Sequence, residues 1–277
     1  ILEALRHVSL QIYGERIQGV EETEGGLIRW KSGKKRVPRY LPMTSAFMRL
    51  VGLYLAEGSI SYSKTRPNAG TLAWHFGPHE RVLAEETVRL LHEVLGATPT
   101  LALTKTQRQL SLGHGIYARL FDALFGRGAS GKRLPIEWLS LPDDLLVSLV
   151  QGYLDGDGHW REDSRPRRKP GWTTSSVSPS LMLEMQLLAA RFGIVSGVGK
   201  TGRHGSYSVI QGRVVRVRQA YQWRFTGKCE RRGVSRPWAK VARIEWVQHR
   251  GPVYNLEVED YPAYSANGLE THNCSSA

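Results

Sequence analysis

The chain has 277 residues, a hydrophobic content of 41% and a net charge of +13, with a pI near 10.0. This length fits one large domain or two modest ones, and no apolar run is long enough to span a bilayer, so we expect no contact with a membrane. The two cysteines, Cys229 and Cys274, have unlike sequence contexts and do not form a disulfide framework. We therefore expect a reducing, cytoplasmic location.

The positive charge is concentrated in one region. Residues 161–250 contain 19 Lys and Arg against 5 Asp and Glu, an excess of +14, whereas the rest of the chain contains 19 against 20, or −1. A basic region of this kind favours a polyanionic partner, and nucleic acid ranks ahead of a membrane surface because no long amphipathic helix carries the charge. A solvated basic face is the alternative interpretation of the charge alone.

The first 40 residues carry weak signals. Residues 2–10 fit a short helix, and residues 20–28 fit a loop or a hairpin. Residues 29–39 form a basic run with one tryptophan, which either contacts phosphates or serves as a linker. After this run, Ser45 is a candidate N-cap for an apolar helix.

Two helices of the same pattern follow, 100 residues apart. Residues 50–58 and 149–158 have apolar side chains at helical spacing, and each carries two small residues one turn apart. These small residues let another backbone approach closely, so the two helices can pack side by side. The helices end in Glu57-Gly58 and Asp157-Gly158, and Gly158 suits the left-handed position that stops a helix.

The acidic residues at the helix ends need a compensating partner. A carboxylate in the last turn faces the negative end of the helix dipole. If the helices pack together, Glu57 and Asp157 lie a few ångströms apart and repel each other unless one is protonated or a metal ion lies between them. The alternative is two terminal acids of no functional consequence.

A similar succession of elements follows each of these helices. The first copy predicts a strand at 71–76, a helix at 80–95, a hairpin over 98–104 and 109–112, and a helix at 116–125, before a glycine-rich bridge at 126–131. The second predicts a strand at 172–176, a helix at 179–192 and strands at 206–210 and 214–226. Two copies of an α-β-α-β-β unit predict a pseudo-twofold body with a single interface.

The last part of the chain differs in composition. Residues 251–277 contain no Lys or Arg, residues 243–246 and 253–258 alternate as strands, and Asn267-Gly268 signals a tight turn.

The paired helices resemble the signature helices of LAGLIDADG homing endonucleases, and the resemblance covers about residues 40–230. It implies an α+β fold of two αββαββα-like repeats, in which a saddle of antiparallel sheets covers double-stranded DNA. The essential acids then are Glu57 and Asp157, which bind Mg²⁺ together with nearby backbone carbonyls, those of Ala56 and Gly156. We expect the chain to act as a monomer.

The resemblance also implies further site residues. A lysine of each half often helps to activate the attacking water, and Lys132 and Lys228 are the candidates, with solvated surface lysines as the alternative. Asp155 stands where the first copy has Leu55, which favours a structural role. The expected readers of DNA bases are Arg216, Arg218, Gln222 and Arg224.

The C-terminus resembles the last splicing blocks of inteins. The matching residues are 253–260, 264–268 and the sequence His272-Asn273-Cys274. The resemblance implies that Asn273 cyclises and cleaves the backbone, that His272 assists, and that Cys274 accepts the upstream chain as a thioester. These blocks predict the C-terminal β-strand portion of a Hint splicing fold.

Two departures from the intein pattern bear on this prediction. Asn255 stands where an acid is frequent and Pro262 where a histidine is frequent, which affects the assistance to cyclisation. Ile1 is not a nucleophile and no Thr-x-x-His block precedes the endonuclease region. We therefore expect splicing to need an N-terminal intein segment as a partner, together with the host-protein exteins.

These resemblances divide the chain into five parts. Residues 1–40 are a linker or a remnant of a splicing or DNA-recognition region, residues 41–130 and 131–232 are the endonuclease repeats, residues 233–273 are the splicing segment, and residues 274–277 begin the C-extein. Two other functions compete: a LAGLIDADG protein that binds nucleic acid without cutting it, such as a maturase or regulator, and a purely structural module. Intact acids at both positions argue against the first, and the second leaves these acids unexplained.

Overall fold

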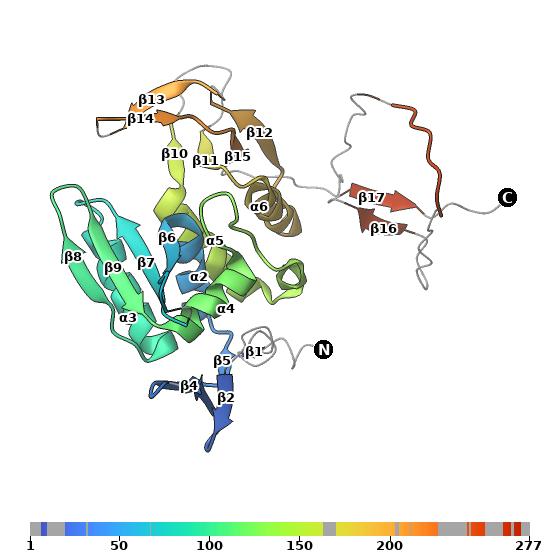
Figure 1. Cartoon of the computed structure of the whole chain (residues 1–277). Helices are drawn as coiled ribbons and strands as arrows, with labels where there is room; N and C mark the ends of the chain where they lie inside the picture. Colours follow the sequence, from blue (N-terminus) through green and yellow to red (C-terminus); the bar gives the residue numbers. More distant parts are fainter. Residues whose placement is uncertain are drawn as a thin grey trace.

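The computed structural model describes residues 7–9, 20–31, 33–66, 68–162, 170–202, 205–210, 212–226, 243, 245–252, 263–266 and 269–272. Its centre is a pair of helices, α2 (Ser45–Glu57) and α5 (Asp143–Asp157), which pack along each other more extensively than any other two elements. Figure 1 shows them between two antiparallel sheets. No helix within the described ranges is long and apolar enough to cross a membrane.

The first repeat follows α2 in the order strand, strand, helix, strand, strand, helix. Its sheet has the strand order β6-β7-β9-β8, and every neighbouring pair is antiparallel. The elements are β6 (Gly58–Tyr62), β7 (Gly70–Phe76), α3 (Arg81–Leu95), β8 (Thr100–Leu103), β9 (Arg108–Gly113) and α4 (Gly115–Phe125). The predicted strand, hairpin and two helices of this repeat are confirmed, and Gly96 ends α3 in the left-handed conformation, with φ of 59°.

The second repeat has the same sheet topology. A loop and a 3₁₀ turn, η2 (Ile136–Ser140), lead into α5, and its sheet has the order β10-β11-β15-β12. The elements are β10 (His159–Arg161), β11 (Gly171–Ser176), α6 (Pro179–Arg191), β12 (Ser196–Thr201) and β15 (Ala220–Thr226), with a hairpin of β13 (Tyr207–Ile210) and β14 (Arg213–Arg216) between the last two. The two four-stranded antiparallel sheets agree with the α+β class predicted from the sequence.

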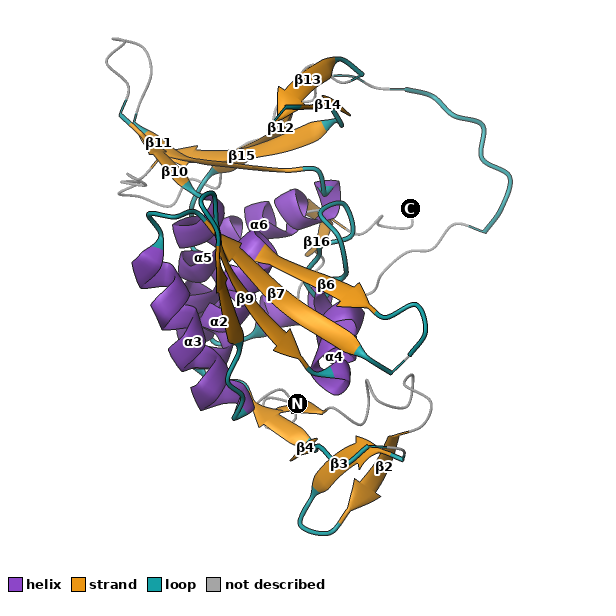
Figure 2. Cartoon of the chain, turned by 60° about the vertical axis from the view of Figure 1, so that its left-hand side comes forward, coloured by secondary structure: helices purple, strands orange, loops and turns teal. Residues whose placement is uncertain are grey.

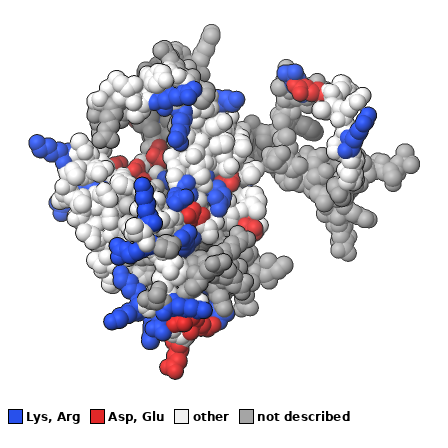
Figure 3. All heavy atoms as spheres, viewed as in Figure 1, with Lys and Arg blue, Asp and Glu red and all other residues white. Residues whose placement is uncertain are grey.

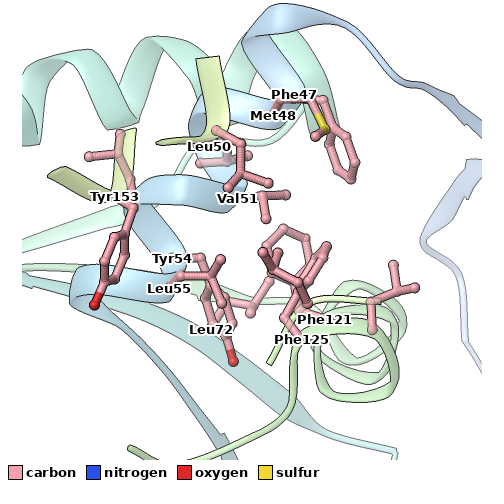
Figure 4. Packing of buried hydrophobic residues seen from close by; sticks show 14 of the residues in the cluster. Phe47, Met48, Leu50, Val51, Tyr54, Leu55, Leu72, Phe121, Phe125 and Tyr153 are labelled. Atoms are coloured by element: carbon pink, nitrogen blue, oxygen red, sulfur yellow. The ribbon is translucent and has the colours of Figure 1, made fainter. Parts of the chain in front are cut away.

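The core lies between these sheets and the helices. Tyr54 is completely buried and its ring meets Phe121 edge to face, with 5.0 Å between the centroids. Figure 4 shows this cluster, with Phe47, Met48, Leu50 and Val51 of α2 on one side. On β7 the side chains alternate, so that Leu72, Trp74 and Phe76 are buried against the helices and Thr71 and His75 face the other way.

Smaller sheets lie outside the repeats. A three-stranded sheet has the order β2-β3-β4, formed by β2 (Val20–Thr23), β3 (Leu27–Trp30) and β4 (Arg36–Pro38). The short strand β1 (His7–Ser9) pairs with β5 (Tyr40–Pro42), and β16 (Ala263–Ala266) pairs with β17 (Leu269–His272). Of the loop and the hairpin considered for residues 20–28, the structure contains the hairpin. The strands β16 and β17 flank the predicted Asn267-Gly268 turn, which lies outside the described residues.

Several predictions of local structure are wrong. Residues 7–9 form a strand and not part of a helix, because they pair with Tyr40–Pro42. Residues 214–226 are not one strand, since β14 and β15 belong to different sheets. The N-cap of α2 is Thr44 and not Ser45: its hydroxyl accepts a hydrogen bond from the Phe47 amide at 3.2 Å. The described residues among 243–246 form no strand.

A candidate metal centre between the two motif helices

The helix pair depends on glycine. A Cβ atom on Gly52 would lie 2.1 Å from the carbonyl oxygen of Leu149, and one on Gly152 would lie 2.5 Å from that of Arg49. Neither position has room for a side chain, so the two backbones touch along this line. The small-residue faces predicted from the sequence are thus the contact between the repeats.

Both helices end where the chain turns directly into a strand. Gly158 is extended, with φ of −80°, so the left-handed stop predicted for it is wrong. Glycine is required there for a different reason: a Cβ would lie 2.2 Å from the carbonyl oxygen of Leu154. Gly58 is also extended, and its Cβ would collide with Tyr54. These turns carry Glu57 and Asp157 to the same end of the molecule.

The two carboxylates interact. A Cβ on Gly156 would lie 3.4 Å from Cγ of Glu57, which shows how closely the helix ends approach. Burial, followed by the charges of Asp157 and Glu80, raises the pKa of Glu57 to about 7. Asp157 is in part exposed to solvent, yet desolvation by the surrounding protein, with a smaller effect of Glu80, raises its pKa to about 6. The lysine considered below opposes both shifts.

Lys132 is buried beside these acids and is not a surface lysine. Its side chain is 7% exposed, and its ammonium donates to the carbonyl oxygens of Leu55 at 2.8 Å and Ala56 at 2.9 Å. Burial lowers the pKa of Lys132 to about 8, although Asp157 and Glu57 counteract this effect. The structure therefore brings three of the predicted site residues together.

The loop before α5 holds Lys132 in place. The Arg133 amide donates to the carbonyl of Phe125 at 3.0 Å, and the hydroxyl of Ser178 donates to the carbonyl of Lys132 at 2.6 Å. The next amide, that of Leu134, donates to the Glu184 carboxylate at 2.6 Å. The segment is thus fixed between the ends of α4 and α6.

Two residues of this region have no signal in the sequence. Glu80 lies at the start of α3, accepts a hydrogen bond from the Gly77 amide at 2.5 Å and adds negative charge beside both acids. Arg49 joins Glu86 on α3 at 2.8 Å to Asp155 on α5 at 2.5 Å. Arg49 belongs to no recognisable spacing pattern, because its partners lie on other helices. The structural role expected for Asp155 agrees with its ion pair.

The remaining predicted residues are dispersed. Gln222 and Arg224 lie on β15, pointing away from the buried Trp223 between them, so they occupy the open face of the second sheet. Arg216 ends the β13–β14 hairpin and Arg218 follows it; both are exposed and lie outside that four-stranded sheet. Lys228, Asn273 and Cys274 lie outside the described residues, and of His272 only the backbone is described, at the end of β17.

The open faces of the sheets differ in charge. The second sheet presents Arg161 and Arg224 on the face that points away from its helices. On the first sheet the corresponding face carries Ser, Thr, Ala, His, Gln and Gly only: residues Ser59, Ser61, Thr71, Ala73, His75, Thr100, Ala102, Gln109, Ser111 and Gly113.

A protein-family model matches part of this chain. Residues 144–230, from the first turn of α5 to just beyond β15, match a protein-family model described as the LAGLIDADG-like domain. The LAGLIDADG assignment made from the sequence is therefore supported for the second repeat. Among the described residues, no group of three or more His, Cys, Asp or Glu side chains has the geometry of a metal site.

Three similar proteins illustrate the range of matches. The chain is 29% identical over 276 residues to the ATP-dependent DNA helicase Hel308 of Thermococcus kodakarensis, which covers 86% of this chain and 22% of that protein. It is 28% identical over 250 residues to an iron–sulfur cluster assembly SufBD family protein of Mycobacterium bovis. This match covers 87% of this chain and 29% of that protein. The structure of I-DmoI with DNA and Mn has a TM-score of 0.44 and 10% identity, covering 66% of this chain and 90% of that chain. The chain thus spans less than a third of the length of these curated relatives.

Proposed function

We propose that this chain is a site-specific double-strand DNA endonuclease that uses a divalent cation, with Glu57 and Asp157 as its essential acids. One observation carries the proposal: two carboxylates with raised pKa values meet at the ends of paired helices beside a buried lysine. Perturbed titrating groups gathered in this way are typical of active sites. A single chain supplies both acids, so we propose that the monomer is active.

The donor set fits Mg²⁺ or a similar ion. Carboxylate and carbonyl oxygens are the ligands that such cations prefer, and the repulsion between Glu57 and Asp157 is relieved when a cation lies between them. Glu57, Asp157 and the carbonyl of Gly156 would hold the ion. The Ala56 carbonyl already accepts a hydrogen bond from Lys132, which leaves it one lone pair for a further ligand. When bound, the cation would polarise the scissile phosphate.

Lys132 would act on the attacking water or on a phosphate oxygen in this reaction. With a pKa of about 8 it changes its charge more readily at neutral pH than an exposed lysine does. Its ammonium lies against the last turn of α2, next to Glu57, where it can orient an attacking water or stabilise negative charge on a phosphate oxygen. Lys228 is the proposed counterpart in the second repeat.

The sheets would hold the duplex. Gln222 and Arg224 on the open face of the second sheet are suited to base edges in a major groove, and the exposed Arg216 and Arg218 to bases or phosphates near the same sheet. The net charge of +13 favours a polyanionic partner of this kind.

The test is incubation with plasmid libraries that carry candidate target sites, in Mg²⁺ and in EDTA. We expect a double-strand cut that requires the cation and is lost in Glu57→Gln and in Asp157→Asn. Tight binding without cleavage in any divalent cation would contradict the nuclease and favour the alternative, a nucleic-acid-binding maturase or regulator.

A second proposed function is protein splicing. The observation that favours it is that relatives named for unrelated activities, a DNA helicase and an iron–sulfur cluster assembly protein, share this segment over less than a third of their length. A self-removing insertion, an intein, accounts for such a distribution. Residues 233–273 would then be the C-terminal splicing segment of a Hint fold, and residues 274–277 the start of the C-extein.

The splicing chemistry would use three consecutive residues. The side-chain amide nitrogen of Asn273 attacks its own backbone carbonyl, a succinimide forms, and the peptide bond to Cys274 breaks as its nitrogen takes up a proton. His272 would polarise that carbonyl or supply the proton. Before this step, the Cys274 thiol attacks the ester or thioester that joins the upstream chain to the first residue of the N-terminal intein segment, and the side chain of that residue leaves. After cyclisation has freed the Cys274 amine, the acyl group shifts from sulfur to nitrogen and a peptide bond forms.

Splicing is tested by supplying an N-terminal intein segment in trans, with flanking reporter domains. We expect a ligated product whose formation Cys274→Ala abolishes, and we expect Asn273→Ala to block release of the downstream domain. Release that persists unchanged in Asn273→Ala would remove this proposal and leave the nuclease proposal intact.

A further inference from the structure

The sheet formed by β2, β3 and β4 is docked firmly onto the first repeat. Ile28 and Val37 on its inner face are 2% and 3% exposed and belong to the main core. The ammonium of Lys35 donates to the carbonyl of Gly113, the last residue of β9, at 3.3 Å. This sheet is therefore a fixed extension of the first repeat.

The charges of this sheet are separated along its strands. The β2–β3 turn carries Glu24, while the β3–β4 turn carries Lys31, Lys34 and Lys35, which we call the basic turn. Figure 3 shows the acidic side chains at the tip of this sheet and lysines and arginines between the tip and the body. The acids Glu21 and Glu22 are paired with arginines, at 2.8 and 2.9 Å. Within the described ranges, no ion pair involves Lys31 or Lys34.

The basic turn lies where the first sheet ends. Lys35 reaches Gly113, which belongs to the open face of that sheet. A Cβ on Gly115 would lie 1.9 Å from the carbonyl oxygen of Asn68 and 3.1 Å from Nε1 of Trp30, so the β6–β7 connection with its exposed Lys64 and Arg66 adjoins the same place. Figure 2, in which this sheet comes forward, shows β2 and β3 beyond the end of β9.

The position supplies positive charge that the open face of the first sheet lacks. The open face of the second sheet carries Arg161 and Arg224, whereas the open face of the first carries no lysine or arginine among the residues described. If a duplex lay across both sheets, the arginines of the second sheet would therefore neutralise phosphates in one half of it, while the open face of the first sheet would neutralise none in the other half. Phosphate contacts dominate the affinity of proteins for DNA, so the unneutralised half needs cations from elsewhere.

We propose that the basic turn binds the phosphate backbone of double-stranded DNA beyond the first sheet, so that the β2–β4 sheet is a second DNA-contacting module of this chain. The inference rests on the proposed DNA-binding function and adds to it a surface outside the two repeats. The two halves of the target would then be held differently: the half over the second repeat by arginines of the sheet, and the half over the first by lysines at its end.

The test compares two charge-matched double variants, each purified as the whole chain. Lys31→Gln with Lys34→Gln removes two exposed charges from the basic turn. Arg81→Gln with Arg89→Gln removes two exposed charges from α3, which packs behind the first sheet. Binding to a long random-sequence duplex is followed by fluorescence anisotropy in Ca²⁺ over a range of salt concentrations.

The basic-turn variant should show a shallower dependence of log K on log salt, by about 2 units for two lost phosphate contacts, while the α3 variant should match the unchanged chain. On a duplex just long enough to cover the two sheets, all three proteins should bind alike. Equal slopes for the unchanged chain and the basic-turn variant would overturn this inference alone, as would an equal loss on the short and long duplexes. Absence of salt-dependent binding by the unchanged chain would overturn the proposed function together with it.

Discussion

Glu57, Asp157 and Lys132 form a coupled set whose charge depends on pH near neutrality. Around pH 7 the two acids share less than two negative charges, because their pKa values are raised to about 7 and about 6. Lys132, with a pKa of about 8, stays largely protonated there. A divalent cation would displace the remaining protons from the acids, so its binding and the pH are linked.

The first prediction concerns this linkage. Both acids have folded-state pKa values above their ordinary ones, so the stability they contribute is present below about pH 4 and is lost as the pH rises through 6 and 7. The loss should be about 2 kcal/mol for the pair after solvent screening. Mg²⁺ should restore it, and the rise in Tm caused by Mg²⁺ should be larger at about pH 8 than at about pH 5.

Differential scanning fluorimetry with Mg²⁺ and with EDTA measures this effect. Glu57→Gln is the control variant, because it removes one of the two acids with a raised pKa and should flatten the pH profile of the metal-free protein. An equal effect of Mg²⁺ at both pH values would contradict the coupling.

The second prediction concerns Lys132. Lys132→Met keeps a side chain of similar length in its buried position but removes the donor to the Leu55 and Ala56 carbonyls. We expect the cleavage rate to fall about 10²-fold or more with DNA affinity nearly unchanged. Single-turnover cleavage and anisotropy measure the two quantities. Lys105→Met, at the exposed β8–β9 turn, is the matched control, and an equal effect of both substitutions would exclude a specific role for Lys132.

At the level of elements, the helices could be predicted and several strands could not. α3 and α4 have strong 3.6-residue periodicity, which the sequence displays directly. β6 alternates over only five residues, with Ile60 and Tyr62 as its large side chains, and β10 has three residues, so both patterns are too short to identify a strand; they are strands because each pairs with the strand that follows it. β1 is a strand only through its pairing with β5, which no local signal indicates.

The third prediction tests the contact between α2 and α5. Gly52→Ala places a Cβ about where the Leu149 carbonyl and the Tyr153 amide lie, so the helices must separate. We expect a loss of about 3 kcal/mol or more in the free energy of unfolding, together with loss of cleavage. Urea titration measures the first quantity. Gly197→Ala on β12, where a Cβ meets nothing within 4 Å, should change stability by less than about 1 kcal/mol.

At the scale of the molecule, the duplication was visible in the sequence while its departures from symmetry were not. Glu57 and Asp157 were found because the same motif occurs twice, and Lys132 because the family resemblance implies a lysine in each half. Arg49 has no such counterpart: the equivalent position of the second repeat is the buried Leu149, and Asp155 faces it where the first repeat has the buried Leu55. A contact that occurs once across a duplicated interface leaves no repeated pattern to detect.

The fourth prediction follows from this unpaired contact. Arg49 is 17% exposed and binds Glu86 and Asp155, so it ties the first repeat to the second. Arg49→Met leaves both carboxylates without that partner, and since Asp155 is half exposed we expect a cost of about 2 kcal/mol. If the repeats unfold as one unit, hydrogen exchange should accelerate by about 30-fold in peptides from α2 and from α5 alike.

Exchange measured by mass spectrometry on the whole chain distinguishes cooperative from separate opening. Arg81→Met breaks an exposed ion pair with Glu85 inside one helix and should leave both peptides within about twofold of the unchanged chain. Faster exchange confined to α2 and α3 in Arg49→Met would show that the repeats open independently. In that case the fold alone would not fix the position of Glu57 relative to Asp157, and a cation bound by both acids would be needed to hold them together.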